Sequence, residues 1–346
     1  MWQTIGQPKA LALLEHSLAI GDLAHAYLFV GAQHIGKMTM ALDLARALNC
    51  EGDKPPCFEC GPCRRISNGK HTDIIIIGLN STNSSGEVKQ RVEIGIDDIR
   101  ELQRNTSFPP YEGKCKIFII DGAEHLSSEA ANCLLKTLEE PPRGVVILLL
   151  TVDELRLLPT VVSRCQRVEL KPMPAEELER VLVESHEVEN DKARLLARLS
   201  QGCLGWAIRA LTDDSYLAQR AQRLAEMLSS LDVGWDERFT YAAKLGNDRK
   251  AVEEVINLWL TWWRDMMLIK CDCKQAITNI DQISMLEKWA QTLSLSQVRN
   301  FIDSLQKSLS QIALNANLRL VLEILMLEMP KKEGTRGHAI PAPVSL

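Results

Sequence analysis

The sequence predicts an α/β protein built on a parallel sheet, followed by a helical half. Four short apolar runs, typical of strands buried on both faces, lie at 26–30, 73–79, 116–121 and 145–151. Amphipathic helical patterns separate these runs, and such alternation gives a parallel sheet covered by helices. From about residue 215 to 330 the patterns are only helical. The 346 residues suffice for two or three domains.

Two helices of the first half are well marked, at 38–49 and 128–140. Ser127 can cap the second of them, and the Pro141-Pro142 pair ends it. In the second half, large apolar residues recur at helical spacing and predict buried helix faces. These residues are Leu258, Trp259, Trp262 and Trp263, and then Leu318, Leu320, Val321, Ile324, Leu325 and Leu327.

Composition restricts the classes of function. The net charge of −5 argues against a nucleic-acid-binding surface over the whole molecule, so any DNA contact must come from a local patch or from partner chains. The longest apolar runs, such as 145–150, are too short to span a membrane. The polar N-terminus does not have the pattern of a signal peptide, and ten cysteines without an export signal favour a reducing, cytoplasmic setting.

A phosphate-binding loop is indicated at 31–39, GAQHIGKMT, between a predicted strand and a predicted helix. Gly31, Gly36 and Lys37 fit the pattern in which backbone N–H groups and one cation hold phosphate oxygens. Two alternatives stay open for this loop. It binds ATP or ADP weakly, or it is a turn without nucleotide.

The metal-binding parts of such a site are incomplete. Where the pattern requires Ser or Thr for Mg²⁺, Met38 has no oxygen to offer, and Thr39 is rotated away by roughly 100° on a helix. Asp121 ends a predicted strand, where the second metal element belongs. Gly122 follows it in place of a Glu that would polarise water, and Glu124 comes two residues later. We therefore expect no useful ATP turnover by this chain alone.

Cys50, Cys57, Cys60 and Cys63 have the spacing C-x6-C-x2-C-x2-C. Four thiolates suit a closed, tetrahedral, structural Zn²⁺ site. An iron–sulfur cluster is disfavoured because the x3-C-P completion of that motif is absent, and reduced free thiols are the third alternative. Zinc is the favoured prediction.

The remaining cysteines are expected to have no ligand role. Cys271 and Cys273 lack further ligands nearby and predict a surface pair. Packing positions are predicted for the others, Cys115, Cys133, Cys165 and Cys203.

Several segments together resemble bacterial clamp-loader AAA+ subunits. They occur in order as HAYLFVGAQHIGK, the four-Cys module, HTDIIII, IFIIDGAEHLSSEAANCLLKTLEEPP and LPTVVSRCQ. NANLRLVLEILML resembles the end of that family's helical collar. The resemblance implies a P-loop AAA+ domain with a zinc module, a helical lid and an all-α collar used for oligomerisation. The ranges are 1–170 with the zinc module at 50–63, 171–213 and 214–330, and composition predicts a disordered tail at 331–346.

The chain is more similar to the delta-prime kind of clamp-loader subunit than to the ATP-hydrolysing gamma/tau kind. Met38 replaces the metal-binding Thr, Gly122 replaces the Glu after the strand Asp, and Gly205 stands where hydrolysing subunits carry a nucleotide-sensing Arg. The resemblance implies a stator that does not hydrolyse ATP. The alternative is an active gamma/tau-like ATPase that uses Thr39 and Glu124 unconventionally.

Arg164, in the SRC motif, is retained. In the family this arginine projects into the ATP site of the neighbouring subunit, so the resemblance implies a catalytic role in trans. A surface ion pair is the alternative. Thr151 matches the family's polar sensor position.

The resemblance implies gamma/tau and delta subunits as partners, with the sliding clamp and primer–template DNA reached through the complex, in the bacterial cytoplasm and without a membrane. Arg100 and Arg104 share a helical face and can add to a DNA-binding patch. The neighbouring acidic residues favour an ordinary solvated face. A free-standing zinc-dependent DNA-binding protein is disfavoured by the negative net charge.

Overall fold

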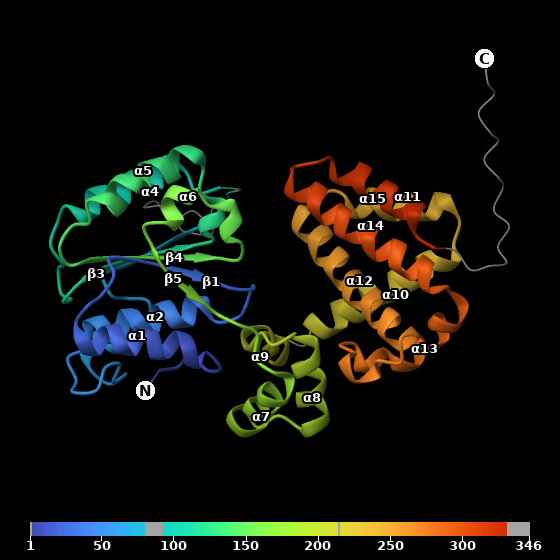
Figure 1. Ribbon diagram of the computed structural model, residues 1–346, viewed down its shortest axis with the longest axis horizontal. Coiled ribbons are helices and arrows are strands. Elements are labelled where there is room, and N and C mark those ends of the chain that lie inside the picture. The colour runs from blue at the N-terminus through green and yellow to red at the C-terminus, as the bar shows by residue number, and fades with distance from the viewer. Residues whose placement is uncertain (1, 80–90, 92, 214, 331–346) are drawn as a thin grey trace, which may run out of the picture. The chain divides into compact units, whose positions relative to one another are not determined.

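The computed structural model describes residues 2–79, 91, 93–213 and 215–330 (Figure 1). The tail predicted at 331–346 lies outside the described residues. The chain forms two compact units. The first consists of Met1–Pro174 and Gly202–Trp206, and the second of Ala175–Gln201 and Ala207–Leu346.

Five parallel strands form the sheet of the first unit, in the order β2-β3-β4-β1-β5. The strands are β1 (Ala26–Val30), β2 (Ile74–Gly78), β3 (Lys116–Asp121), β4 (Val145–Thr151) and β5 (Gln166–Glu169). The helices of this unit are α1 (Pro8–Ile20), α2 (Lys37–Asn49), α3 (Gly61–Ser67), α4 (Ile96–Thr106), α5 (Ser128–Glu139) and α6 (Pro159–Val162). The predicted cap of α5 is confirmed, because Ser127 Oγ accepts a hydrogen bond of 3.1 Å from the N–H of Ala130.

Helices cover both faces of this sheet, as Figure 1 shows. Successive residues of a strand face opposite sides, so Tyr27 and Leu148 pack in the core beneath α1 and α2. Leu28 and Leu149 pack in the opposite core, beneath α4, α5 and α6. A parallel sheet with two helical layers and a phosphate loop between β1 and α2 confirms the predicted AAA+ P-loop fold.

The prediction that all four runs are buried on both faces was wrong for β2. This strand lies at the edge of the sheet, and Ile76 is 45% exposed. The run IIII has the composition of a central strand, but only the strand order decides which strand has a neighbour on one side alone.

The second unit is helical throughout its described residues. Its elements are α7 (Ala175–His186), α8 (Asn190–Leu199), the greater part of α9 (Leu204–Thr212), α10 (Ser215–Asp232), α11 (Trp235–Leu245), α12 (Arg249–Lys270), α13 (Ile283–Thr292), α14 (Leu295–Ala313) and α15 (Leu318–Glu328). Among the described helices of the whole chain, none combines the length and the apolar character that crossing a bilayer requires.

The tryptophan stripe of α12 forms the core of the second unit, as predicted. Trp259, Trp262 and Trp263 have no exposed surface. The prediction was wrong for part of α15, because Leu320 is 56% exposed and both Ile324 and Leu327 are more than 40% exposed. The buried residues of this helix are Val321, Leu322, Leu325 and Met326. With apolar residues all around the helix, the sequence pattern could not distinguish the buried face.

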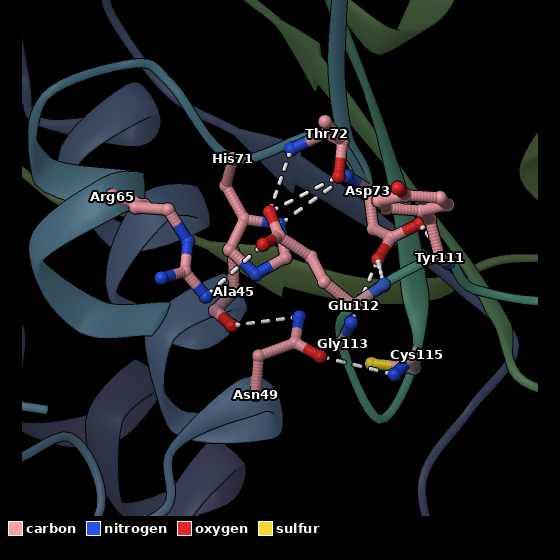
Figure 2. Close-up of polar contacts among 10 residues, drawn as sticks. All are labelled: Ala45, Asn49, Arg65, His71, Thr72, Asp73, Tyr111, Glu112, Gly113 and Cys115. Atoms are coloured by element: carbon pink, nitrogen blue, oxygen red, sulfur yellow. Dashed lines mark hydrogen bonds and ion pairs between the residues drawn. The ribbon is translucent and has the colours of Figure 1, made fainter. Parts of the chain in front are cut away.

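A buried carboxylate fixes the turn that leads into β3 (Figure 2). Asp73, which precedes β2, accepts hydrogen bonds of 2.7–2.9 Å from the backbone N–H groups of Tyr111, Glu112 and Gly113. Burial raises the pKa of Asp73, but the three N–H donors outweigh burial and leave the pKa below its ordinary value.

The same turn is held to α3 through Glu112. Its carboxylate accepts hydrogen bonds from the backbone and hydroxyl of Thr72 and lies 3.1 Å from the guanidinium of Arg65. The turn therefore connects the sheet to the helix that carries Cys63 (Figure 2).

We expect Asp73→Asn to lower the free energy of unfolding by about 1–3 kcal/mol, because an amide group would face three N–H donors. The native pKa is depressed, so this stabilisation is present above the unfolded pKa of about 3.9 and is lost as the pH falls through the lower native pKa. Thermal unfolding of both proteins at pH 7 and at about pH 3 measures the difference. The exposed Asp303→Asn is the control, and equal stability of the two variants at pH 7 would contradict this assignment.

Candidate functional site

The phosphate loop occupies the predicted place between β1 and α2. Gly36 has a φ of 109°, a conformation that favours glycine, and it precedes the first turn of α2. The Lys37 ammonium donates to the carbonyl oxygens of Gly31 and Ala32, at 2.7 and 2.8 Å. Burial lowers the pKa of Lys37, and the nearby carboxylates of Glu124 and Asp121 oppose that effect. The ammonium group of Lys37 is therefore already hydrogen-bonded to two carbonyl oxygens of its own loop.

Met38 and Thr39 lie as the sequence predicts. The Met38 side chain packs against the core formed with α1 and α2, and the side chain of Thr39 is exposed to solvent. Met38 offers no oxygen at the position where the phosphate-loop pattern requires a hydroxyl for Mg²⁺. The chemistry of this donor set does not fit a Mg²⁺–nucleotide complex.

Gly205 lies against the phosphate loop itself. Its backbone N–H donates to the carbonyl oxygen of His34 at 3.0 Å. A Cβ atom at residue 205 would lie 2.6 Å from that oxygen, which is closer than real Cβ contacts. The position that the resemblance assigns to a nucleotide-sensing Arg therefore cannot hold any side chain without a shift of the backbone.

The end of β3 carries Asp121, which is exposed, and then Gly122. Gly122 has a φ of 79°, so a Glu at this position would require a strained left-handed backbone. The Glu124 side chain is only 5% exposed, and its Oε2 has no hydrogen-bond partner among the described residues. Glu124 thus lies inside the site, near Lys37, although it is not adjacent to the strand.

The four predicted metal ligands come together. The Sγ atoms of Cys50, Cys57, Cys60 and Cys63 all lie within 4.8 Å of one another. A tetrahedral ion with Zn–S bonds of ~2.3 Å would separate the sulfurs by roughly 3.8 Å. The cluster can hold a metal ion, and a set of four thiolates fits zinc.

Backbone groups favour the thiolate of Cys57, whereas burial raises the pKa of Cys63. The N–H groups of Gly52 and Cys60 donate to Cys50 Sγ and Cys57 Sγ, at 3.3 and 3.4 Å. Hydrogen bonds from the backbone of Cys60 and Glu59 lower the pKa of Cys57 to about 6. Gly52 also allows the close approach of this loop, since a Cβ atom there would lie 3.0 Å from the Cβ of Cys57.

The cysteine cluster is attached to the sheet by polar contacts at the end of α2. Asn49 Oδ1 accepts from the N–H of Cys115 at 3.0 Å (Figure 2), and Lys114 Nζ donates to the carbonyl oxygen of Cys50. Loss of the metal would therefore affect the end of α2 and the start of β3.

The other cysteines lie as predicted. Cys271 and Cys273 are exposed at the end of α12. The remaining four pack against or within the two cores of the first unit; they are Cys115, Cys133, Cys165 and Cys203.

Arg164 follows α6 and makes two contacts. Its Nη2 lies 2.7 Å from Glu139 Oε1, and its Nη1 donates to the carbonyl oxygen of Thr160 at 2.9 Å. The Arg164 side chain is 35% exposed, so it is accessible from solvent. Glu139 was not singled out from the sequence. The available signal was a carboxylate in the last turn of α5, where the helix dipole disfavours negative charge.

The remaining predicted residues have local contacts. Thr151 is buried, and its Oγ1 exchanges hydrogen bonds with the backbone of Asp153, at 3.0 and 3.1 Å. Arg100 lies 3.4 Å from Asp97 on an exposed face of α4. This pair is what the solvated-face alternative predicts.

Comparison with known proteins shows what this chain is similar to. Residues 6–174 match the family model described as DNA polymerase III, delta subunit. The chain is 36% identical over 239 residues to the DNA polymerase III subunit tau of Escherichia coli, which covers 66% of this chain and 35% of tau. It is 28% identical over 332 residues to the subunit delta′ of Bacillus subtilis, which covers 93% of this chain and 95% of delta′.

Among solved structures, a DNA polymerase III gamma subunit-related protein from Thermotoga maritima aligns with 91% of this chain and 97% of its own, at 18% identity and a TM-score of 0.42. The chain spans only 35% of the tau subunits of Escherichia coli and Salmonella typhimurium. The chain is therefore similar to tau, gamma and delta′ subunits of DNA polymerase III, in agreement with the resemblance of its motifs to clamp-loader subunits.

Proposed function

We propose that this chain is a delta-prime-like subunit of the DNA polymerase III clamp loader that does not itself hydrolyse ATP. It acts as a stator in the bacterial cytoplasm, supplies Arg164 to the ATP site of a neighbouring subunit, and helps to load the sliding clamp on primed DNA. Its partners are gamma/tau and delta subunits. The match to a delta′ subunit over nearly the whole length of both chains supports this proposal.

The observation that carries the proposal is the packing of the Met38 side chain against the core at the start of α2, which leaves no oxygen for Mg²⁺ at that position of the phosphate loop. Two further features support it. Gly205 lies against the carbonyl oxygen of His34, and the backbone at Gly122 is left-handed. The loop with Gly31, Gly36, Lys37 and Asp121 then serves as a structural turn or a weak phosphate site.

The second candidate function is an active gamma/tau-like ATPase. It is favoured by the identity of 36% to tau, which exceeds the 28% to delta′. The buried position of Glu124 near Lys37 also favours it, because a carboxylate in the site can act as a base.

We expect the purified chain to hydrolyse no more ATP than a buffer blank at saturating ATP and Mg²⁺. The reason is the missing metal ligand together with the missing base at 122. Steady-state ATP hydrolysis is measured beside a gamma/tau chain from the same organism as the positive control. Turnover within about tenfold of that control, abolished by Glu124→Gln, would establish the second candidate instead.

Zinc is proposed as the metal at Cys50, Cys57, Cys60 and Cys63, with a structural role. It would join α2 to α3 through four thiolates, leaving no open coordination position for a substrate. The buried contacts of the module support this role, since Cys63 has no exposed surface.

A further inference from the structure

We propose that Glu139 is a positioning residue for Arg164. The inference rests on the proposed role of Arg164 at the neighbouring subunit's ATP site. The geometry that carries it is the 2.7 Å contact between Glu139 Oε1 and Arg164 Nη2, together with the hydrogen bond from Nη1 to the carbonyl oxygen of Thr160.

The two contacts act on opposite ends of a planar group. A carboxylate holds one terminal nitrogen of the guanidinium and a backbone carbonyl holds the other, so rotation of the side chain is restricted. A free arginine side chain has high conformational entropy, and binding a phosphate would reduce it. If the side chain is already restrained, less conformational entropy is lost when the phosphate binds. The guanidinium has further N–H donors for that phosphate.

Both anchors of this arrangement are fixed by the fold. Glu139 follows Leu138, which is buried, and Arg164 follows α6 just after the buried Val161, which belongs to the same core. Gln103 of α4 donates to the carbonyl oxygen of Cys133 at 2.8 Å and so connects α5 to α4. The carboxylate therefore belongs to the last residue of a helix that packs in this core.

The position of Glu139 makes a role in helix stability implausible on electrostatic grounds. A negative side chain in the last turn of a helix interacts unfavourably with the carbonyl groups there. Glu140, the next residue, is the C-cap of α5, and within the described part of the chain its side chain makes no hydrogen bond or ion pair. This neighbour supplies a matched control.

The test is a double-mutant cycle in the loader reconstituted with all its subunits. The variants are Glu139→Gln, Arg164→Ala, the double variant and Glu140→Gln, each checked for assembly by gel filtration. We expect Glu139→Gln to lower kcat for ATP hydrolysis about three- to tenfold with little change in KM, because positioning acts on the transition state. In the Arg164→Ala background the same change should have no further effect, and Glu140→Gln should be silent.

The possible outcomes separate the two proposals. If Arg164→Ala leaves hydrolysis unchanged, the trans role itself is wrong. If Arg164→Ala is inactive but Glu139→Gln is unchanged, more active, or equally harmful in both backgrounds, the positioning role is wrong.

A second measurement needs no partner subunit. In the isolated chain, ¹⁵N relaxation of the Arg164 Nε–H group reports how ordered the side chain is. Glu139→Gln should reduce that order and Glu140→Gln should not. Equal order in both variants would overturn the proposal, whatever the ATPase assay gives.

Discussion

Replacing Arg164 by Ala is expected to lower ATP hydrolysis at the neighbouring site of the reconstituted loader on the order of 10³-fold. An arginine supplied in trans stabilises charge on the transferring phosphoryl group, and such arginines are worth about 10³–10⁵-fold in GTPases. The side chain is accessible, and its guanidinium has N–H donors beyond those that contact Glu139 and the Thr160 carbonyl, so an incoming phosphate can bind it. The measurement is the burst of ATP hydrolysed per complex in a rapid-quench experiment, in which one site should fail to react.

Two control variants test whether the effect is specific to the guanidinium of Arg164. Arg156→Ala removes an exposed arginine from the short turn Glu154–Arg156 and should leave the burst unchanged. Arg164→Lys keeps the charge but loses the planar donor group, so it should recover only a small part of the rate. Binding of the variant chain to its partner subunits must stay intact. A full burst with Arg164→Ala would contradict the trans role.

The second large effect is expected from loss of the metal at the cysteine cluster. Cys57→Ser should reduce zinc from about one ion per chain to nearly zero and lower the Tm by more than about 5 °C. Structural zinc contributes free energies of about 10–16 kcal/mol in small peptides, and bound zinc would here also stabilise the contacts from Asn49 and Lys114 to the sheet. Elemental analysis and thermal unfolding give the two values.

Cys57 is a suitable position because it is only partly buried, so the Ser variant removes a metal ligand with little change in packing. Cys271→Ser, at an exposed cysteine outside the cluster, should keep both the zinc and the Tm. A strong chelator should lower the Tm of the native chain and leave Cys57→Ser unchanged. Native protein that contains iron, or no metal at all, would rule out the zinc assignment.

Local patterns were sufficient for most elements of the first unit. The bounds of β1, β3 and β4 are those of the predicted runs, because each run is continuous, apolar and bounded by polar or turn residues. β2 was found but its burial was not, since a run of four isoleucines carries no information on which strand lies at the edge. The predicted burial of Leu320, Ile324 and Leu327 was wrong for a related reason. Apolar residues occur all around their helix, and only packing against neighbouring helices decides which face is buried.

Some features of the candidate site could likewise be predicted from the sequence, and others are seen only in the folded structure. The sequence alone was enough to predict the cluster of four thiols, the missing hydroxyl at Met38 and the missing Glu at 122, because each follows from the residue type at a fixed spacing. The tertiary structure alone decided that Gly205 touches His34, that Glu124 lies buried near Lys37, and that Glu139 holds Arg164. These pairs join residues far apart in the chain or across separate elements, and only the folded backbone sets the distances between them.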